Sequence, residues 1–171
     1  MPNSTTNPPI EIGIPPWTVA TTGPAASGQV TQWYYHCSRV FSSGSCVASG
    51  VNVVAGTTTG AVVRVFLLDL GGNILASNAV AGTTLSTASV ANAVPFSTPY
   101  AIVGPQAYFI AVQANAGTNN ILSFVTQVAA PAGFIGNTSA DVPSSLATPT
   151  SGVITPPTAY VSAKAPVVSL Y

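Results

Sequence analysis

The sequence has 171 residues, and only 4% of them are charged, whereas an ordinary soluble domain carries about 25%. The three basic and three acidic side chains sum to a net charge of zero. Three basic residues cannot neutralise a run of phosphates, which excludes nucleic-acid binding as the main function. A hydrophobic content of 47% also argues against intrinsic disorder. The charged side chains are Glu11, Arg39, Arg64, Asp69, Asp141 and Lys164.

Membrane insertion is not expected, although the mean hydropathy is high at +0.50. The longest strongly apolar run, residues 61–70, contains Arg64 and Asp69. It is also far shorter than the roughly 20 residues that a spanning helix needs. The first residues show no basic start followed by an apolar core, so we expect no signal peptide.

The composition favours strands and turns, because Val, Thr, Ser, Gly, Ala and Pro dominate and strong helix formers are scarce. A neutral protein has little electrostatic repulsion between its own copies and associates easily. We therefore expect this protein to work inside an assembly.

Residues 1–28 hold six of the prolines among Ser, Thr and Gly, which predicts an extended N-terminal arm. The alternative is a disordered tail, the usual state of such a terminus. In the arm interpretation, four apolar side chains are the candidate anchors on a partner. These anchors are Ile10, Ile12, Ile14 and Trp17.

Residues 29–130 are expected to form the folded domain from short strands separated by turn signals. The expected strands are residues 29–41, 46–54, 61–70, 74–79, 83–94, 108–114 and 121–129. Gly71, Gly72 and Asn73 predict a hairpin turn, in which Asp69 bonds backbone N–H groups. Strands at this spacing are typical of a β-sandwich or jelly roll.

The two most apolar strands of the expected sandwich hold Phe66 and Ile110. In residues 108–114, Tyr108, Ile110 and Val112 point to one face and Phe109 to the other. We expect all the apolar strand faces to form one core, with Phe66 and Ile110 buried in it. Residues 131–171 become proline-rich again and are expected to pack on the sandwich or on a neighbour. The predicted fold is thus all-β, a β-sandwich or jelly roll with extended Pro-rich N- and C-terminal arms.

Cys37 and Cys46 are separated by eight residues that include a turn-like serine and glycine run. A hairpin there would bring the sulfurs onto neighbouring strands, where a disulfide is one outcome and two reduced thiols are the other. As metal ligands these cysteines and His36 make only three, whereas a structural zinc needs four. We expect no metal site and no cofactor.

Catalysis is not expected. His36 is the only histidine, and a Cys37–His36 pair would need Asp69 or Asp141 nearby to orient it. A lone histidine on a strand is more often structural. Sugar stacking on Trp33, Tyr34 and Tyr35 is also disfavoured, because consecutive strand residues point to opposite sides.

Three stretches resemble small bacteriophage virion proteins that have a jelly-roll β-sandwich. The first is the hairpin at residues 65–77, VFLLDLGGNILAS. The second joins Val94-Pro95-Phe96 to the strand at residues 104–113, GPQAYFIAVQ, and the third is the ending at residues 154–157 and 165–171. The resemblance implies a non-enzymatic structural component of a phage particle, on either capsid or tail.

The expected function is therefore that of a capsid decoration protein on the virion, which binds the major capsid protein and its own copies. A homotrimer fits the three-fold sites of an icosahedral shell, and a dimer on two-fold sites is the runner-up. The alternative is a receptor- or carbohydrate-binding module of a tail or head fibre. That module would present Tyr34, Tyr100 or Tyr108 to solvent.

Overall fold

Strands are the only regular secondary structure in the part of the chain that the computed structural model describes. The described residues are 10–11, 35–56, 60–115, 124–125, 136–140, 152–154, 165–166 and 168–171. The strands are β1 (Ile10–Glu11), β2 (Tyr35–Ser42), β3 (Cys46–Val54), β4 (Val62–Leu68), β5 (Ile74–Ser77), β6 (Thr83–Thr84), β7 (Ala91–Ile102), β8 (Gln106–Ala114), β9 (Phe124–Val125), β10 (Gly136–Ala140), β11 (Ala165–Pro166) and β12 (Val168–Leu170).

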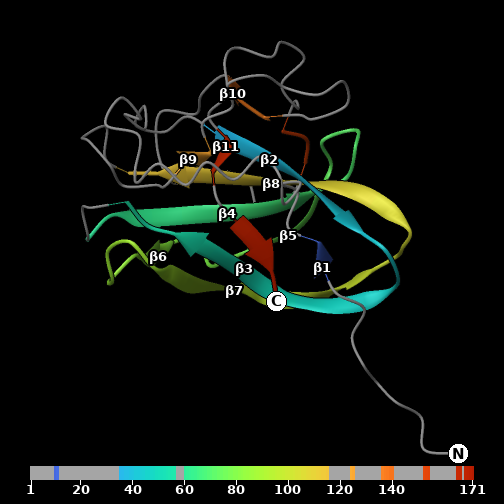
Figure 1. The fold of residues 1–171 in the computed structure, drawn as a ribbon, viewed down its shortest axis with the longest axis horizontal. Helices are drawn as coiled ribbons and strands as arrows, with labels where there is room; N and C mark the ends of the chain where they lie inside the picture. Colours follow the sequence, from blue (N-terminus) through green and yellow to red (C-terminus); the bar gives the residue numbers. More distant parts are fainter. Residues whose placement is uncertain are drawn as a thin grey trace, which may run out of the picture.

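Two antiparallel sheets make up most of the structure. The larger sheet has the order β1-β2-β8-β4-β5, with β10 also paired to β2 and β6 to β4. The smaller sheet has the order β12-β3-β7, and β9 pairs with β11 separately. In Figure 1, β4 and β8 form one layer and β3 and β7 lie in another below it. The all-β prediction is confirmed, and the arrangement is consistent with a β-sandwich.

The hairpin between β4 and β5 forms where the sequence predicts it. The Asp69 carboxylate accepts hydrogen bonds from the backbone N–H of Asn73 at 2.9 Å and from its side-chain amide at 2.7 Å. These bonds lower the pKa of Asp69 below its ordinary 3.8, with the Asn73 side chain as the main cause. The turn is thus closed by Asp69, as expected.

The strand expected within residues 83–94 is present only in part. Residues 83–94 split into β6 and the start of β7, with a turn between them. The Asn92 side chain holds this turn, since it accepts from the N–H groups of Ser86 and Thr87 and donates to the carbonyls of Thr87 and Val90. A side chain that satisfies four backbone groups in this way competes with strand pairing.

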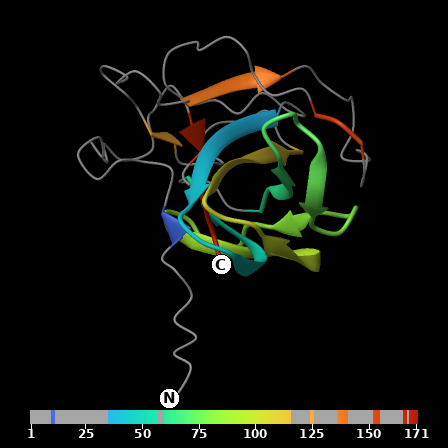
Figure 2. The same cartoon turned by 90° about the vertical axis from the view of Figure 1, so that its right-hand side faces the viewer.

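The apolar side chains form two clusters rather than the single core that the sequence predicted. The inner cluster lies between the two sheets and includes Ile110, whose exposed fraction is 0%. Phe66 is equally buried, but it lies in an outer cluster on the opposite face of the larger sheet. β4 and β8 are therefore buried on both faces, because each contributes alternate residues to each cluster. Figure 2 shows the two sheets curving around the region that the inner cluster fills.

The outer cluster contains Tyr35, Cys37, Phe66, Leu68, Phe109, Ala111 and Ile154. The rings of Tyr35 and Phe66 meet edge to face, with their centroids 5.6 Å apart. Ile154 joins it from residues 152–154, which add to the hairpin through bonds from Ile154 N–H to the Gly72 carbonyl at 2.8 Å and from Ile74 N–H to the Gly152 carbonyl at 2.9 Å.

Two short connections cross from one sheet to the other at the same end of the sandwich. Residues 43–45 lead from β2 to β3, and residues 103–105 lead from β7 to β8. The connections touch through backbone, because a Cβ on Gly104 would overlap the backbone of Gly44. Ser45 Oγ accepts a hydrogen bond from Gly104 N–H at 3.3 Å, and the Tyr108 hydroxyl bonds both backbone groups of Val103.

The strand β7 lies at one edge of the smaller sheet and has only β3 as a ladder partner among the described strands. Pro95 and Pro99 lie along it, and Pro95 is opposite Gly50. Proline is tolerated at a sheet edge because its missing N–H is not needed for the inner ladder.

Candidate docking face

The outer face of the smaller sheet has no charged side chain among its described strands. β3, β7, β12 and the following Tyr171 contain no Asp, Glu, Lys, Arg or His. Strand alternation and register place half of these side chains away from the inner cluster. We call this surface the neutral face, and its side chains include Val47, Asn52, Ala93, Pro95, Ala101, Ser169 and Tyr171.

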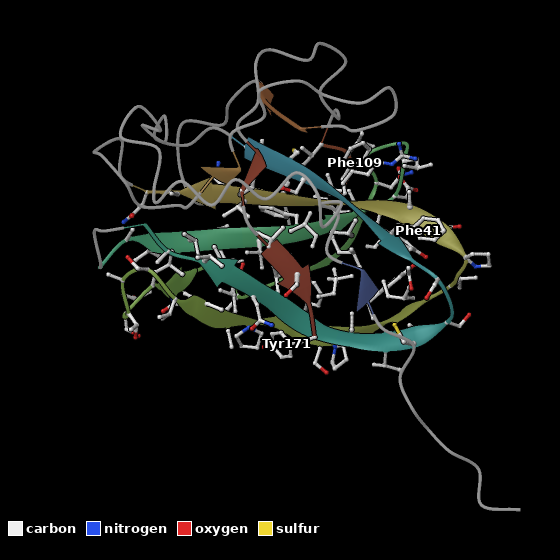
Figure 3. All side chains as sticks on the ribbon, in the orientation of Figure 1. Phe41, Phe109 and Tyr171 are labelled. Carbon is white, nitrogen blue, oxygen red and sulfur yellow. The ribbon has the colours of Figure 1, made fainter. Side chains whose placement is uncertain are left out.

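Two large apolar side chains of the neutral face are open to solvent. Val47 is 57% exposed and Tyr171 is 38% exposed. Figure 3 shows Tyr171 below β3 and Phe109 above β8, on opposite sides of the sandwich. Removing uncharged side chains of this kind from water costs little free energy, so the face is suited to contact with another protein surface.

Tyr171 is held on this face by backbone contacts with a bulge in β3. The pairing of β3 with β7 shifts between Ala48 and Gly50. At that position Ser49 N–H donates to the Tyr171 carbonyl at 2.6 Å, and Tyr171 N–H donates to the Gly50 carbonyl at 3.2 Å. A Cβ on Gly50 would lie 2.6 Å from the Tyr171 hydroxyl oxygen, so the ring lies directly on the glycine.

The outer face of the larger sheet has a different chemistry, because it holds a buried cation. Arg64 has an exposed fraction of 0%. Its Nε donates to Asn78 Oδ1 and its Nη1 donates to the Val80 carbonyl, both at 3.2 Å. The guanidinium carbon lies 5.0 Å from the centroid of the Phe66 ring. Burial lowers the pKa of Arg64, while Tyr35 acts in the opposite direction.

The side chain of Asn78 links this polar cluster to the backbone of β4. Its carbonyl oxygen also accepts from Val65 N–H at 3.0 Å, and its amide donates to the Val63 carbonyl and to Thr83 Oγ1, each at 3.1 Å. The cluster ties β4 to the chain that follows β5, which indicates a structural role. The sequence analysis did not predict this cluster, although an arginine inside an apolar run, Arg64 in residues 61–70, is a signal for a buried cation.

The hairpin that was expected to bring Cys37 and Cys46 onto neighbouring strands does not form. Cys37 pairs with Ala111 in the larger sheet, and Cys46 pairs with Ile102 in the smaller one. The expected hairpin is wrong because residues 43–45 cross between the sheets instead of turning back within one. Both thiols are free, which is the second of the two outcomes expected.

The buried thiol of Cys37 is also expected to be unreactive. Cys37 is 1% exposed, and burial raises its pKa to about 12. It therefore stays protonated at neutral pH, and a thiolate is what a cysteine nucleophile or metal ligand requires. Within the described residues, no group of three or more His, Cys, Asp or Glu is placed to hold a metal ion.

The remaining candidates fall in different places. Ile10 lies in β1, where its backbone pairs with Ser42, while Ile12, Ile14 and Trp17 lie outside the described residues. Of the tyrosines that a receptor- or carbohydrate-binding module would present to solvent, Tyr108 is 1% exposed and Tyr100 packs against the inner cluster. Tyr34 lies outside the described residues. The described tyrosines of that set do not form a solvent-facing platform.

The chain matches no protein-family model, no curated protein and no solved structure. In the described part of the chain, no helix is long and apolar enough to cross a membrane.

Proposed function

We propose that this protein is a non-enzymatic structural component of a phage virion, a decoration protein that binds the capsid shell. The observation that carries the proposal is the neutral face, in which a whole three-stranded sheet presents no charged side chain. Binding to a permanent partner is the use that such a surface fits best, because the centres of stable interfaces are depleted in charge.

The strand connectivity supports the jelly-roll form of the sandwich. In a jelly roll, early strands of the chain pair with late ones across two sheets. Here β2 pairs with β8 and β3 pairs with β7, so that one pair is nested inside the other along the chain. The motifs that resemble phage virion proteins fall in this same region, on the β4–β5 hairpin and on β8.

The proposed partners are the major capsid protein and further copies of this chain, with a homotrimer at three-fold sites as the favoured arrangement. Closed symmetry satisfies neutral surfaces without open-ended growth. The N-terminal residues 1–28 are proposed as an arm that strengthens attachment to the shell.

A charge placed on the neutral face tests the proposal. We expect Val47→Asp to bind poorly to particles that lack the protein, because a carboxylate would be desolvated in the contact. The matched control is Val153→Asp, since Val153 is equally exposed at 60% but lies by the hairpin of the larger sheet. The measurement is co-sedimentation with particles, together with the copy number per virion.

A decoration protein is expected in hundreds of copies per particle, and only Val47→Asp is expected to lower its occupancy. Equal occupancy for wild type and both variants would exclude the neutral face as the attachment surface. A handful of copies per particle would indicate a fibre-tip protein instead.

A further inference from the structure

The segment that ends at Tyr171 is bound to the sandwich in the manner of a peptide ligand. β12 lies antiparallel to β3, with Val168, Ser169 and Leu170 opposite Val53, Asn52 and Val51. Val168 is 3% exposed and Leu170 is 5% exposed, and both belong to the inner cluster. Ahead of them, the Pro166 carbonyl accepts a buried hydrogen bond from Ser38 Oγ at 2.6 Å. The segment is thus recognised through backbone pairing and through two inward side chains.

The acceptor site is shaped for this segment. Gly50 leaves open the space that the Tyr171 ring occupies, and any larger residue there would also meet the Val94 carbonyl at 2.5 Å from its Cβ. The bulge beside it frees Ser49 N–H to bond the Tyr171 carbonyl. Glycines and bulges in strands typically mark such a close approach of another chain segment.

The site also lies at a sheet edge. Among the described strands, β12 has β3 as its only ladder partner, so that the β3–β7 ladder does not depend on it. No charged side chain occurs in residues 165–171 or in β3, so that side-chain charge does not oppose the approach of a second copy. Residues 155–164 connect Ile154 to Ala165, and a chain of that length reaches up to roughly 35 Å when extended.

From these contacts we propose that the edge of β3 is an acceptor site for residues 165–171 of a neighbouring copy, which exchange with the chain's own segment in the assembled state. The same pairing, the same two buried side chains and the same ring on Gly50 form in either case. Exchange of an identical element therefore links copies at little cost. Head-to-tail exchange closes a ring, which is compatible with the proposed trimer, although the acceptor site does not depend on attachment to a capsid.

Cysteine cross-linking of the full chain tests this exchange. Asn52 and Ser169 are opposite each other, with Nδ2 and Oγ 3.4 Å apart, so cysteines at both positions are close enough to be bridged. Asn52→Cys and Ser169→Cys are placed in separate chains with different affinity tags, and the two chains are co-expressed and oxidised. Cys46 is replaced by Ala in all variants.

The control uses a neighbouring pair on a strand that cannot exchange in this way. Ala93 on β7 is opposite Asn52. β7 lies in the middle of the sequence, between β6 and β8, and is not part of the segment that is proposed to exchange. Asn52→Cys co-expressed with Ala93→Cys should give no covalent heterodimer, while the double variant in one chain should form its bridge internally and so verify the oxidation.

We expect a covalent heterodimer from Asn52→Cys with Ser169→Cys and none from the control mixture. The double variant N52C/S169C should then yield covalent oligomers. If it bridges only within one chain, or fails to bridge although the control double variant does, the exchange is refuted. Because the cross-link is measured on purified protein, its outcome does not depend on whether the protein attaches to particles.

Discussion

At the scale of single residues, the guanidinium of Arg64 joins β4 to the chain that follows β5, together with the side chain of Asn78. It contacts Phe66, Asn78 and the Val80 carbonyl from a position with no exposed surface. A buried cation is costly unless its hydrogen bonds are made. The residues that receive these bonds are therefore as important as the arginine.

We expect Arg64→Ala to lower the free energy of unfolding by about 2–4 kcal/mol, because a buried and a partly buried hydrogen bond and the ring contact are lost and a cavity remains. Urea denaturation measures the change. Arg39→Ala is the control, since Arg39 is only half-buried on the same sheet, and should change stability by less than about 1 kcal/mol. Equal effects of the two variants would show that Arg64 has no special role.

The two thiols should differ sharply in reactivity. Cys37 is buried with its pKa raised to about 12, while Cys46 is partly exposed. We expect a thiol reagent at pH 8 to modify one cysteine in the native protein and two after denaturation, with Cys46→Ala removing the native signal. Rapid modification of Cys37 in the folded Cys46→Ala variant would contradict its position in the outer cluster.

At the scale of elements, the two connections between the sheets depend on each other. Gly104 lies against the backbone of Gly44, where no side chain can yield. We expect Gly104→Ala to destabilise the fold by about 1–3 kcal/mol, since the connections must move apart to admit the methyl group. Thermal unfolding tests this against Ser45→Ala, which removes a single hydrogen bond at the same place. A Gly104→Ala variant as stable as Ser45→Ala would mean that the connections are not in close contact.

The β4–β5 hairpin should weaken in acid. The pKa of Asp69 is lower in the folded state than in the unfolded chain, so its contribution to stability is present above about pH 4. That contribution is lost as the pH falls through the lowered pKa and the carboxylate is protonated. We expect wild type to lose more stability than Asp69→Asn between pH 5 and about pH 2, as measured by urea unfolding at each pH. If the free energy of unfolding of wild type and of Asp69→Asn changed equally with pH, the hydrogen bonds of the Asp69 carboxylate would not stabilise the hairpin.

Local signals account for the elements that were predicted correctly. The hairpin at residues 71–73 and the alternation of Tyr108, Ile110 and Val112 are set by near neighbours in the chain, and the structure has both. The β2–β3 hairpin was predicted from the same kind of signal and is wrong. A short serine and glycine connection can turn within one sheet or cross between two, and only the packing of the sheets decides which. The neutral face and the Tyr171–Gly50 contact could not be predicted from the sequence for the same reason. Both bring together residues that are far apart in the chain, and only the packing of the sheets decides which of these residues meet.

At the scale of the whole molecule, burial on both faces of the larger sheet makes β4 and β8 the centre of the structure. Phe66 on β4 and Ile110 on the neighbouring β8 are one position out of register and belong to different clusters. We expect Phe66→Ala and Ile110→Ala each to cost about 2–5 kcal/mol, since each leaves a cavity in a filled layer. Calorimetry should show a lowered melting temperature for both. Unchanged melting of Phe66→Ala would mean that the outer cluster does not contribute to the fold.

The two prolines of β7 have a consequence for a protein that has so little charge. An exposed sheet edge offers unpaired N–H and C=O groups that recruit further strands, and proteins protect such edges with charged side chains such as lysine, with prolines, or with bulges. This chain has one lysine in total, and none in the smaller sheet. Pro95 and Pro99 interrupt the row of donors along β7, so a foreign strand cannot form a continuous ladder there. At this edge, protection against strand addition therefore rests on the backbone and not on charge, and we expect it to be insensitive to salt concentration.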